Sequence, residues 1–118
     1  MTDANPAANP TTKPVDAATK AELDAVVDEH ELVLVEFYTE GCGICASLDP
    51  VLGNVARATD AVVVTVNPRD DPQLVEAYTV RSVPTLILFD HGERVGRLDD
   101  GFVGADELVA FVENRGQE

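Results

Sequence analysis

Two cysteines, Cys42 and Cys45, are the residues whose type and spacing most directly indicate chemistry in this sequence. They are the only cysteines of the chain, and Gly43 and Ile44 separate them. Thiols at this Cys-x-x-Cys spacing typically carry out redox exchange or bind a metal ion in an intracellular protein. The pair therefore indicates thiol–disulfide chemistry, with metal binding as the competing hypothesis.

The residues around the cysteines place them between a strand and a helix. An apolar, β-branched run over residues 32–38 predicts a strand that is covered on both faces. Apolar residues then recur at helical spacing up to about Thr59. Cys42 therefore falls in the first turn of a helix, where unpaired backbone N–H groups and the helix dipole stabilise a thiolate. Cys45 follows one turn later and is shielded by the helix.

This asymmetry predicts a different role for each cysteine. Cys42 is the expected nucleophile, which attacks a substrate disulfide and forms a mixed disulfide. Cys45 is the expected resolving residue, which releases the reduced substrate and leaves a Cys42–Cys45 disulfide. This redox-active disulfide suffices for the chemistry, so we expect no bound cofactor or metal.

Other interpretations of the pair stay open at this point. A structural zinc site would need further ligands, and the candidates His30 and His91 are far apart in the sequence. An iron–sulfur cluster would need thiolates from a second chain. The two thiols could also hold a soft metal ion for delivery, or be inert side chains at a buried helix end.

Glu36 is a carboxylate within the apolar run that precedes the cysteines. If the strand is central, Glu36 is buried, and burial raises its pKa toward neutrality. Such a group can accept the proton of Cys45, directly or through one water. If the strand lies at a sheet edge, Glu36 faces solvent instead.

Composition limits the domain organisation and the possible partners. The length of 118 residues suits one domain, which we place at residues 16–118 after a disordered tail rich in Pro, Ala, Asn and Thr over residues 1–15. The net charge of -14 makes nucleic acids and anionic membranes poor partners and favours a monomer. With only two lysines, this acidic surface is typical of halophilic proteins.

The pattern of apolar residues predicts an α/β fold. We expect helices over residues 19–29, from the cysteines to about 59, from Pro72 onward and over 106–114, and strands over 32–38, 61–66, 85–89 and 94–98. The sequence gives little support for a strand around Val15. A strand-helix-strand unit must be parallel, whereas a tight turn at residues 90–93 suits an antiparallel hairpin, so the sheet is mixed with helices on both faces. The start of the chain lacks a basic and apolar leader, and we expect a cytoplasmic location.

Several segments together resemble the thioredoxin family over about residues 20–115. The resemblance lies in residues 35–45, Pro50, residues 80–89, Gly92 and Gly101. It implies the thioredoxin fold, a central mixed sheet flanked by helices on both faces. By the same resemblance Cys42 and Cys45 take the roles of nucleophile and resolving cysteine, and Glu36 stands where the family usually has a buried Asp.

The resemblance also implies a substrate groove beside the cysteines. Pro84 matches the family's cis-proline, and the backbone of Val83 would hydrogen-bond an extended substrate peptide. The residues that would form the groove are Gly43, Ile44, Val83, Pro84 and Gly101.

Three residues depart from the family's pattern. Gly41 replaces the usual Trp and frees the loop beside the nucleophile. Ile44 replaces the usual Pro between the cysteines, which should alter the reduction potential. Thr65 replaces a common Lys, and without that cation Glu36 should be easier to protonate.

The resulting functional prediction is a cytoplasmic protein-disulfide reductase of the thioredoxin type. Its substrates would be disulfide-containing proteins, and its electrons would come from a donor that resembles thioredoxin reductase. The departures keep two alternatives open, namely a redox-inert thioredoxin-fold module that binds peptides, and a glutaredoxin-like or narrow-specificity oxidoreductase.

Overall fold

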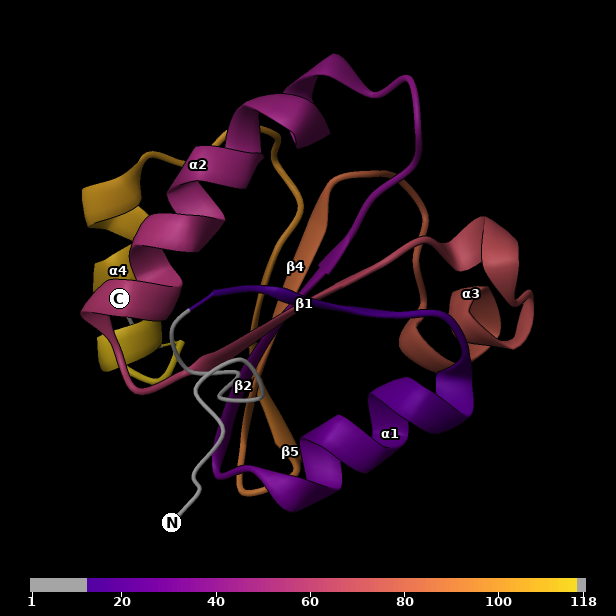
Figure 1. Ribbon diagram of the computed structural model, residues 1–118, viewed down its shortest axis with the longest axis horizontal. Coiled ribbons are helices and arrows are strands. Elements are labelled where there is room, and N and C mark those ends of the chain that lie inside the picture. Colours follow the sequence, from indigo (N-terminus) through magenta and orange to yellow (C-terminus); the bar gives the residue numbers. More distant parts are fainter. Residues whose placement is uncertain (1–12, 117–118) are drawn as a thin grey trace, which may run out of the picture.

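The computed structural model describes residues 13–116 of the chain. Within this range a five-stranded mixed sheet has the strand order β1-β3-β2-β4-β5, and helices cover both of its faces (Figure 1). In chain order, the elements are β1 Val15–Ala17, α1 Lys20–Glu29, β2 Leu32–Phe37, α2 Gly43–Ala58, β3 Val62–Val66, the 3-10 helix η2 Pro68–Asp70, α3 Gln73–Tyr78, β4 Thr85–Asp90, β5 Glu93–Leu98 and α4 Ala105–Glu113. The predicted α/β architecture is confirmed.

The strand that leads to the cysteines, β2, lies in the middle of the sheet. It pairs in parallel with β3 and antiparallel with β4, and all six of its residues are buried. An apolar strand with both faces covered needs this position, because its side chains leave water on either side. The expected central strand is therefore confirmed, and Glu36 does not lie at a sheet edge.

The alternation of side chains along β2 divides the hydrophobic core into two clusters. Leu32 and Leu34 pack with the buried residues of α2 and α4, whereas Val33, Val35 and Phe37 pack with those of α1 and α3. Figure 1 shows α2 and α4 together on one side of the sheet and α1 and α3 on the other. Because successive side chains point to opposite faces, Glu36 lies on the same face as Leu34, beneath α2.

The helix α2 holds the cysteine pair against the sheet. It buries Leu48, Leu52 and Val55, which recur every three or four residues and so lie on one face. The helix continues through Pro50 as a single element of 16 residues. Among the helices within residues 13–116, none is long and apolar enough to cross a membrane.

The remaining elements agree with the sequence-based expectations, with two additions. Thr19 caps α1 through a hydrogen bond from the Glu22 backbone N–H to its hydroxyl oxygen, and the hairpin turn places His91 and Gly92 at positive φ. β1, which the sequence hardly supported, and η2, which it did not predict, are both present. Residues 1–12 of the expected tail lie outside the described range, and Val15 is the first residue of β1.

Two glycines give a test of how tightly the sheet and helices are packed. A Cβ atom on Gly96 of β5 would lie 2.7 Å from Cζ of Phe111 and 2.9 Å from Cα of Gly116. Gly96→Ala should therefore lower the free energy of unfolding by about 1–3 kcal/mol, because the ring or the C-terminal backbone must move.

Gly53 is the matched control, because it lies inside α2 and a Cβ there would approach only the flexible end of Arg57, at 3.4 Å. Gly53→Ala should raise the free energy of unfolding by about 0.5–1 kcal/mol through helix propensity. Denaturant unfolding in concentrated KCl measures the free energy of unfolding of both variants. Equal effects of the two substitutions would show that the close contacts at Gly96 do not lower the stability of the Gly96→Ala protein.

Candidate active site

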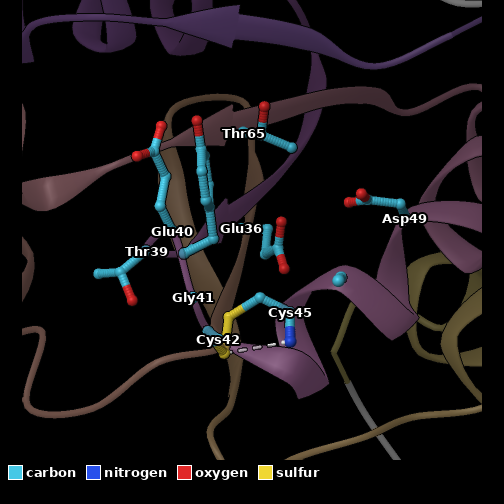
Figure 2. Close-up of a pocket in the computed structure, with 10 residues that line it drawn as sticks. Glu36, Thr39, Glu40, Gly41, Cys42, Cys45, Asp49 and Thr65 are labelled. Carbon is cyan, nitrogen blue, oxygen red and sulfur yellow. Dashed lines mark hydrogen bonds between the residues drawn. A yellow bond between two sulfur atoms is a disulfide. The ribbon is translucent and has the colours of Figure 1, made fainter.

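Cys42 and Cys45 form a disulfide where the chain passes from the end of β2 into α2 (Figure 2). Their Cα atoms are 5.2 Å apart. Cys42 is the N-cap residue of α2, and its sulfur accepts a hydrogen bond from the backbone N–H of Cys45 at 3.1 Å. Such an N–H also stabilises negative charge on the same sulfur after reduction, together with the helix dipole.

The two cysteines differ in their access to solvent. Cys42 is half-buried, whereas the side of α2 shields Cys45, of which only 4% is exposed. Ile44, between them, is 47% exposed. Cys42 is therefore the more accessible of the two cysteines.

Glu36 lies beneath the cysteine pair, near Cys45 in Figure 2. It is 1% exposed, and its Oε2 atom has no hydrogen-bond partner among the described residues. Burial, with a smaller contribution from the negative charge of Asp49, raises the pKa of the Glu36 carboxyl from its usual 4.5 to about 7. The carboxyl group thus changes its protonation state near neutral pH.

A pocket of about 420 Å³ joins this carboxyl group to the disulfide. The pocket is lined by Glu36, Tyr38, Thr39, Glu40, Gly41, Cys42, Cys45, Ala46, Asp49 and Thr65. Three of these residues are acidic and none is basic. A Cβ atom on Gly41, which has φ 85°, would meet no atom of residues 13–116 within 4 Å, so this wall of the pocket is open.

Two of the lining residues explain why Glu36 has no cationic or hydrogen-bonding partner within the part of the chain that the structure describes. Thr65 is the register partner of Glu36 on β3, but its hydroxyl donates to Asp16 at 2.8 Å. Asp49 is a residue that the sequence reasoning missed, although its place four residues after Cys45 puts both on one face of α2. Its charge opposes ionisation of Glu36, where a lysine would favour it.

The structure brings some of the expected groove residues close to this pocket. The Val83–Pro84 peptide bond is cis, as the family resemblance implies, and Pro84 is buried whereas Val83 is half-buried. Val83 lines a second pocket, which shares Thr39 with the first. Gly43, Ile44, Pro84 and Gly101 line neither pocket.

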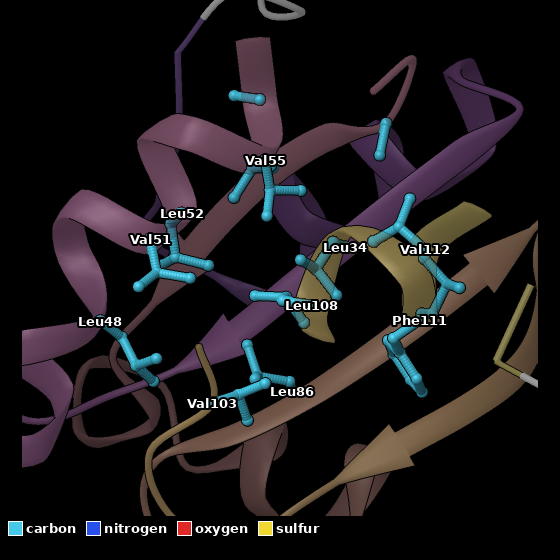
Figure 3. Close-up of a cluster of buried hydrophobic side chains, with 14 of the residues drawn as sticks. Leu34, Leu48, Val51, Leu52, Val55, Leu86, Val103, Leu108, Phe111 and Val112 are labelled. Atoms are coloured by element: carbon cyan, nitrogen blue, oxygen red, sulfur yellow. The ribbon is translucent and has the colours of Figure 1, made fainter. Parts of the chain in front are cut away.

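Gly101, with φ 103°, lies in the loop from β5 to α4. Two residues later Val103 packs in the same cluster as Leu48 of α2 and Leu86 of β4 (Figure 3). The loop therefore reaches the half of α2 that carries the cysteines.

The zinc hypothesis that used the two histidines is wrong for this fold. His30 and His91 line one pocket, but this pocket lies at Leu32, where β2 starts. The cysteines follow the opposite end of β2. A strand of six residues spans about 20 Å. Among residues 13–116, no three His, Cys, Asp or Glu side chains are placed to hold a metal ion.

These features define a protein that exchanges thiols and disulfides, since an accessible sulfur at a helix N-terminus lies beside a shielded one with a titrating carboxyl group beneath them. A family model described as Thioredoxin matches residues 14–114. The chain is 37% identical over 114 residues to a thioredoxin of Mycobacterium bovis, covering 95% of this chain and 90% of the relative. It is 40% identical over 82 residues to a thioredoxin of Chlamydia caviae, covering 69% of this chain and 79% of that relative.

Among solved structures, a single-residue mutant of a thioredoxin from Halobacterium salinarum superposes with a TM-score of 0.85 at 36% identity, covering 94% of this chain and 96% of that one. The chain belongs to the thioredoxin family. It is a thiol–disulfide oxidoreductase, and the alternative of a redox-inert binding module is not favoured.

Proposed function

We propose that the protein reduces disulfide bonds of other proteins, with Cys42 as the nucleophile and Cys45 as the resolving residue. The observation that carries this proposal is the position of the Cys42 sulfur. It is accessible and accepts the N–H of Cys45 at the start of α2, while Cys45 itself is 4% exposed. An anionic sulfur that substrates can reach is the group that attacks a disulfide.

The reaction transfers two electrons and two protons in two steps. The Cys42 thiolate attacks one sulfur of the substrate disulfide, and the other substrate sulfur leaves as a thiolate and takes up a proton. The thiolate of Cys45 then attacks the Cys42 sulfur of the mixed disulfide. The second substrate sulfur leaves and is protonated, and the Cys42–Cys45 disulfide seen here is the product.

Glu36 is the proposed proton acceptor for Cys45. The resolving thiol must lose its proton before it attacks, and the buried carboxylate lines the same pocket. A group with a pKa of about 7 is well matched to this task at neutral pH, because it is partly ionised and still takes up a proton readily.

The proposed docking surface consists of Gly43, Ile44, Val83, Pro84 and Gly101. Ile44 offers an exposed apolar side chain between the cysteines, and Val83 precedes the cis-proline. Two glycines leave the backbone open to close approach by an extended substrate chain.

The proposed setting is the cytoplasm of an organism that accumulates salt, with a thioredoxin-reductase-like protein as electron donor and no bound cofactor. The net charge of -14 supports this setting and a monomeric state. The likeness to a thioredoxin from Halobacterium salinarum supports it as well.

The test is the reduction of a model protein disulfide by dithiothreitol in multi-molar KCl. We expect the protein to accelerate the reaction catalytically, whereas protein that was reduced and alkylated with iodoacetamide beforehand should give only the rate of dithiothreitol alone. Equal rates for the two preparations of folded protein would refute the proposed reductase.

A further inference from the structure

A second pocket, of about 350 Å³, adjoins the disulfide pocket through Thr39, which lines both. We call it the arginine groove. Its lining consists of Thr39, Pro68, Arg69, Pro72, Val75, Val80, Arg81, Ser82 and Val83. These residues come from η2, from α3 and from the segment before the cis peptide bond, so the groove runs away from the cysteines along one face of the molecule.

The inner surface of the groove is mainly apolar. Val75 of α3 is 44% exposed although it is a large apolar residue, and Val83 is half-buried beside the cis-proline. Pro68 and Pro72 add two rigid apolar rings. An apolar concave surface of this size suits an apolar side chain of a bound molecule.

The charge of the groove is opposite to that of the rest of the chain. Among residues 13–116, its lining holds Arg69 and Arg81 and no acidic residue, whereas the lining of the adjoining disulfide pocket holds three acidic residues and no basic one. The chain as a whole has 8 basic and 22 acidic residues. Two of its few cations therefore lie in one groove beside the active site.

Both guanidinium groups are available to a partner. Arg69 and Arg81 are exposed, and neither makes an ion pair within residues 13–116. The nearby Asp71 is not part of the lining, and its carboxylate accepts hydrogen bonds from the backbone N–H groups of Lys20 and Gln73. Exposed guanidinium groups of this kind bind carboxylates.

We propose that the arginine groove binds the segment of the substrate polypeptide next to its disulfide and selects an apolar residue accompanied by Asp or Glu. This inference rests on the proposed reductase function, because the substrate must already present its disulfide to Cys42. Thr39 connects the groove to the disulfide pocket, and each residue of an extended chain spans about 3.3 Å. The selected residues therefore lie within a few positions of the substrate cysteine.

The test uses three short peptides, each as a symmetric disulfide dimer, that differ only in the two residues beside the cysteine. These residues are Leu and Asp in the first peptide, Leu and Lys in the second, and Ser and Asp in the third. Reduction is driven by dithiothreitol, and kcat/KM is measured at the lowest KCl concentration that keeps the protein folded. The variants are Arg69→Glu, Arg81→Glu and Val75→Ser. The control is Arg57→Glu, an exposed arginine of α2 on the other face of the sheet, which changes the net charge by the same amount.

Relative to the control, each groove arginine variant should lower the ratio of kcat/KM for the Asp peptide to that for the Lys peptide by about fivefold. Val75→Ser should lower the ratio for Leu over Ser by about threefold. Equal ratios in the groove variants and in Arg57→Glu would overturn the groove assignment while the reductase function stands. No reduction of any dimer by the unaltered protein would overturn the reductase function, and the groove assignment with it.

Discussion

Cys45→Ser protein is expected to stop turning over and to remain covalently joined to its substrate through Cys42. Cys42 still attacks the substrate disulfide, because its sulfur stays accessible at the N-terminus of α2. Serine provides no thiolate for the second step, so the mixed disulfide accumulates. Turnover should fall to the rate without protein, which is the largest effect that any single substitution here can have.

In the experiment, reduced Cys45→Ser protein is mixed with an oxidised model substrate in the absence of other thiols. Mass spectrometry then quantifies the covalent complex. Cys42→Ser protein is the matched variant, and it should give neither turnover nor complex. Its remaining thiol, on Cys45, is 4% exposed and out of reach of a protein substrate. A complex that forms through Cys45 and not through Cys42 would reverse the two roles.

The part of the site that could be predicted from sequence is the part that depends on neighbouring residues. The apolar run of β2, the helical spacing after Cys42 and the position of Cys45 three residues after Cys42 are local patterns. They fix a strand, a helix and a thiol pair at their junction. The burial of Glu36 needed one further step, the central position of β2, which the apolar residues on both faces of this strand already favour.

The parts that the sequence did not reveal depend on residues far apart in the chain. β1 has only three residues, and it forms a strand because it pairs in parallel with β3. Val15, for example, is the register partner of Val64. Asp49 matters only because α2 lies over β2, which brings its charge to Glu36. The arginine groove combines η2, α3 and the segment before β4, and no pattern within any one of them indicates a pocket.

The second large effect concerns stability, and Glu36→Gln is expected to stabilise the oxidised protein at about pH 8 by about 3 kcal/mol. The folded-state pKa of Glu36, about 7, is higher than its usual value of 4.5. Between these two values the folded protein binds more protons than the unfolded chain does, so stability falls as pH rises through this window. Glutamine has nearly the same shape and stays neutral at every pH.

Denaturant unfolding between about pH 5 and pH 8 measures this effect. The two proteins should differ little at the acidic end and diverge as pH rises, with the variant more stable. Asp49→Asn is the matched control. It should reduce the pH dependence only slightly, because burial is the larger cause of the raised pKa and the charge of Asp49 the smaller one. Parallel stability curves for Glu36→Gln and the unaltered protein would show that other groups produce the pH dependence.

The same substitution should slow the reduction of substrate by about a hundredfold near neutral pH, the usual contribution of a positioned proton acceptor. Glutamine cannot take the proton of Cys45, and the shielded thiol must then lose it to solvent. We expect the single-turnover rate of the reduced, unaltered protein to rise as pH passes about 7, the pKa of Glu36, and the variant should lose this rise. A gain in stability without this loss of rate would mean that Glu36 is buried at a cost to folding and takes no part in the proton transfer. A gain in stability together with the loss of rate is the outcome that the position of Glu36 beneath Cys45 predicts.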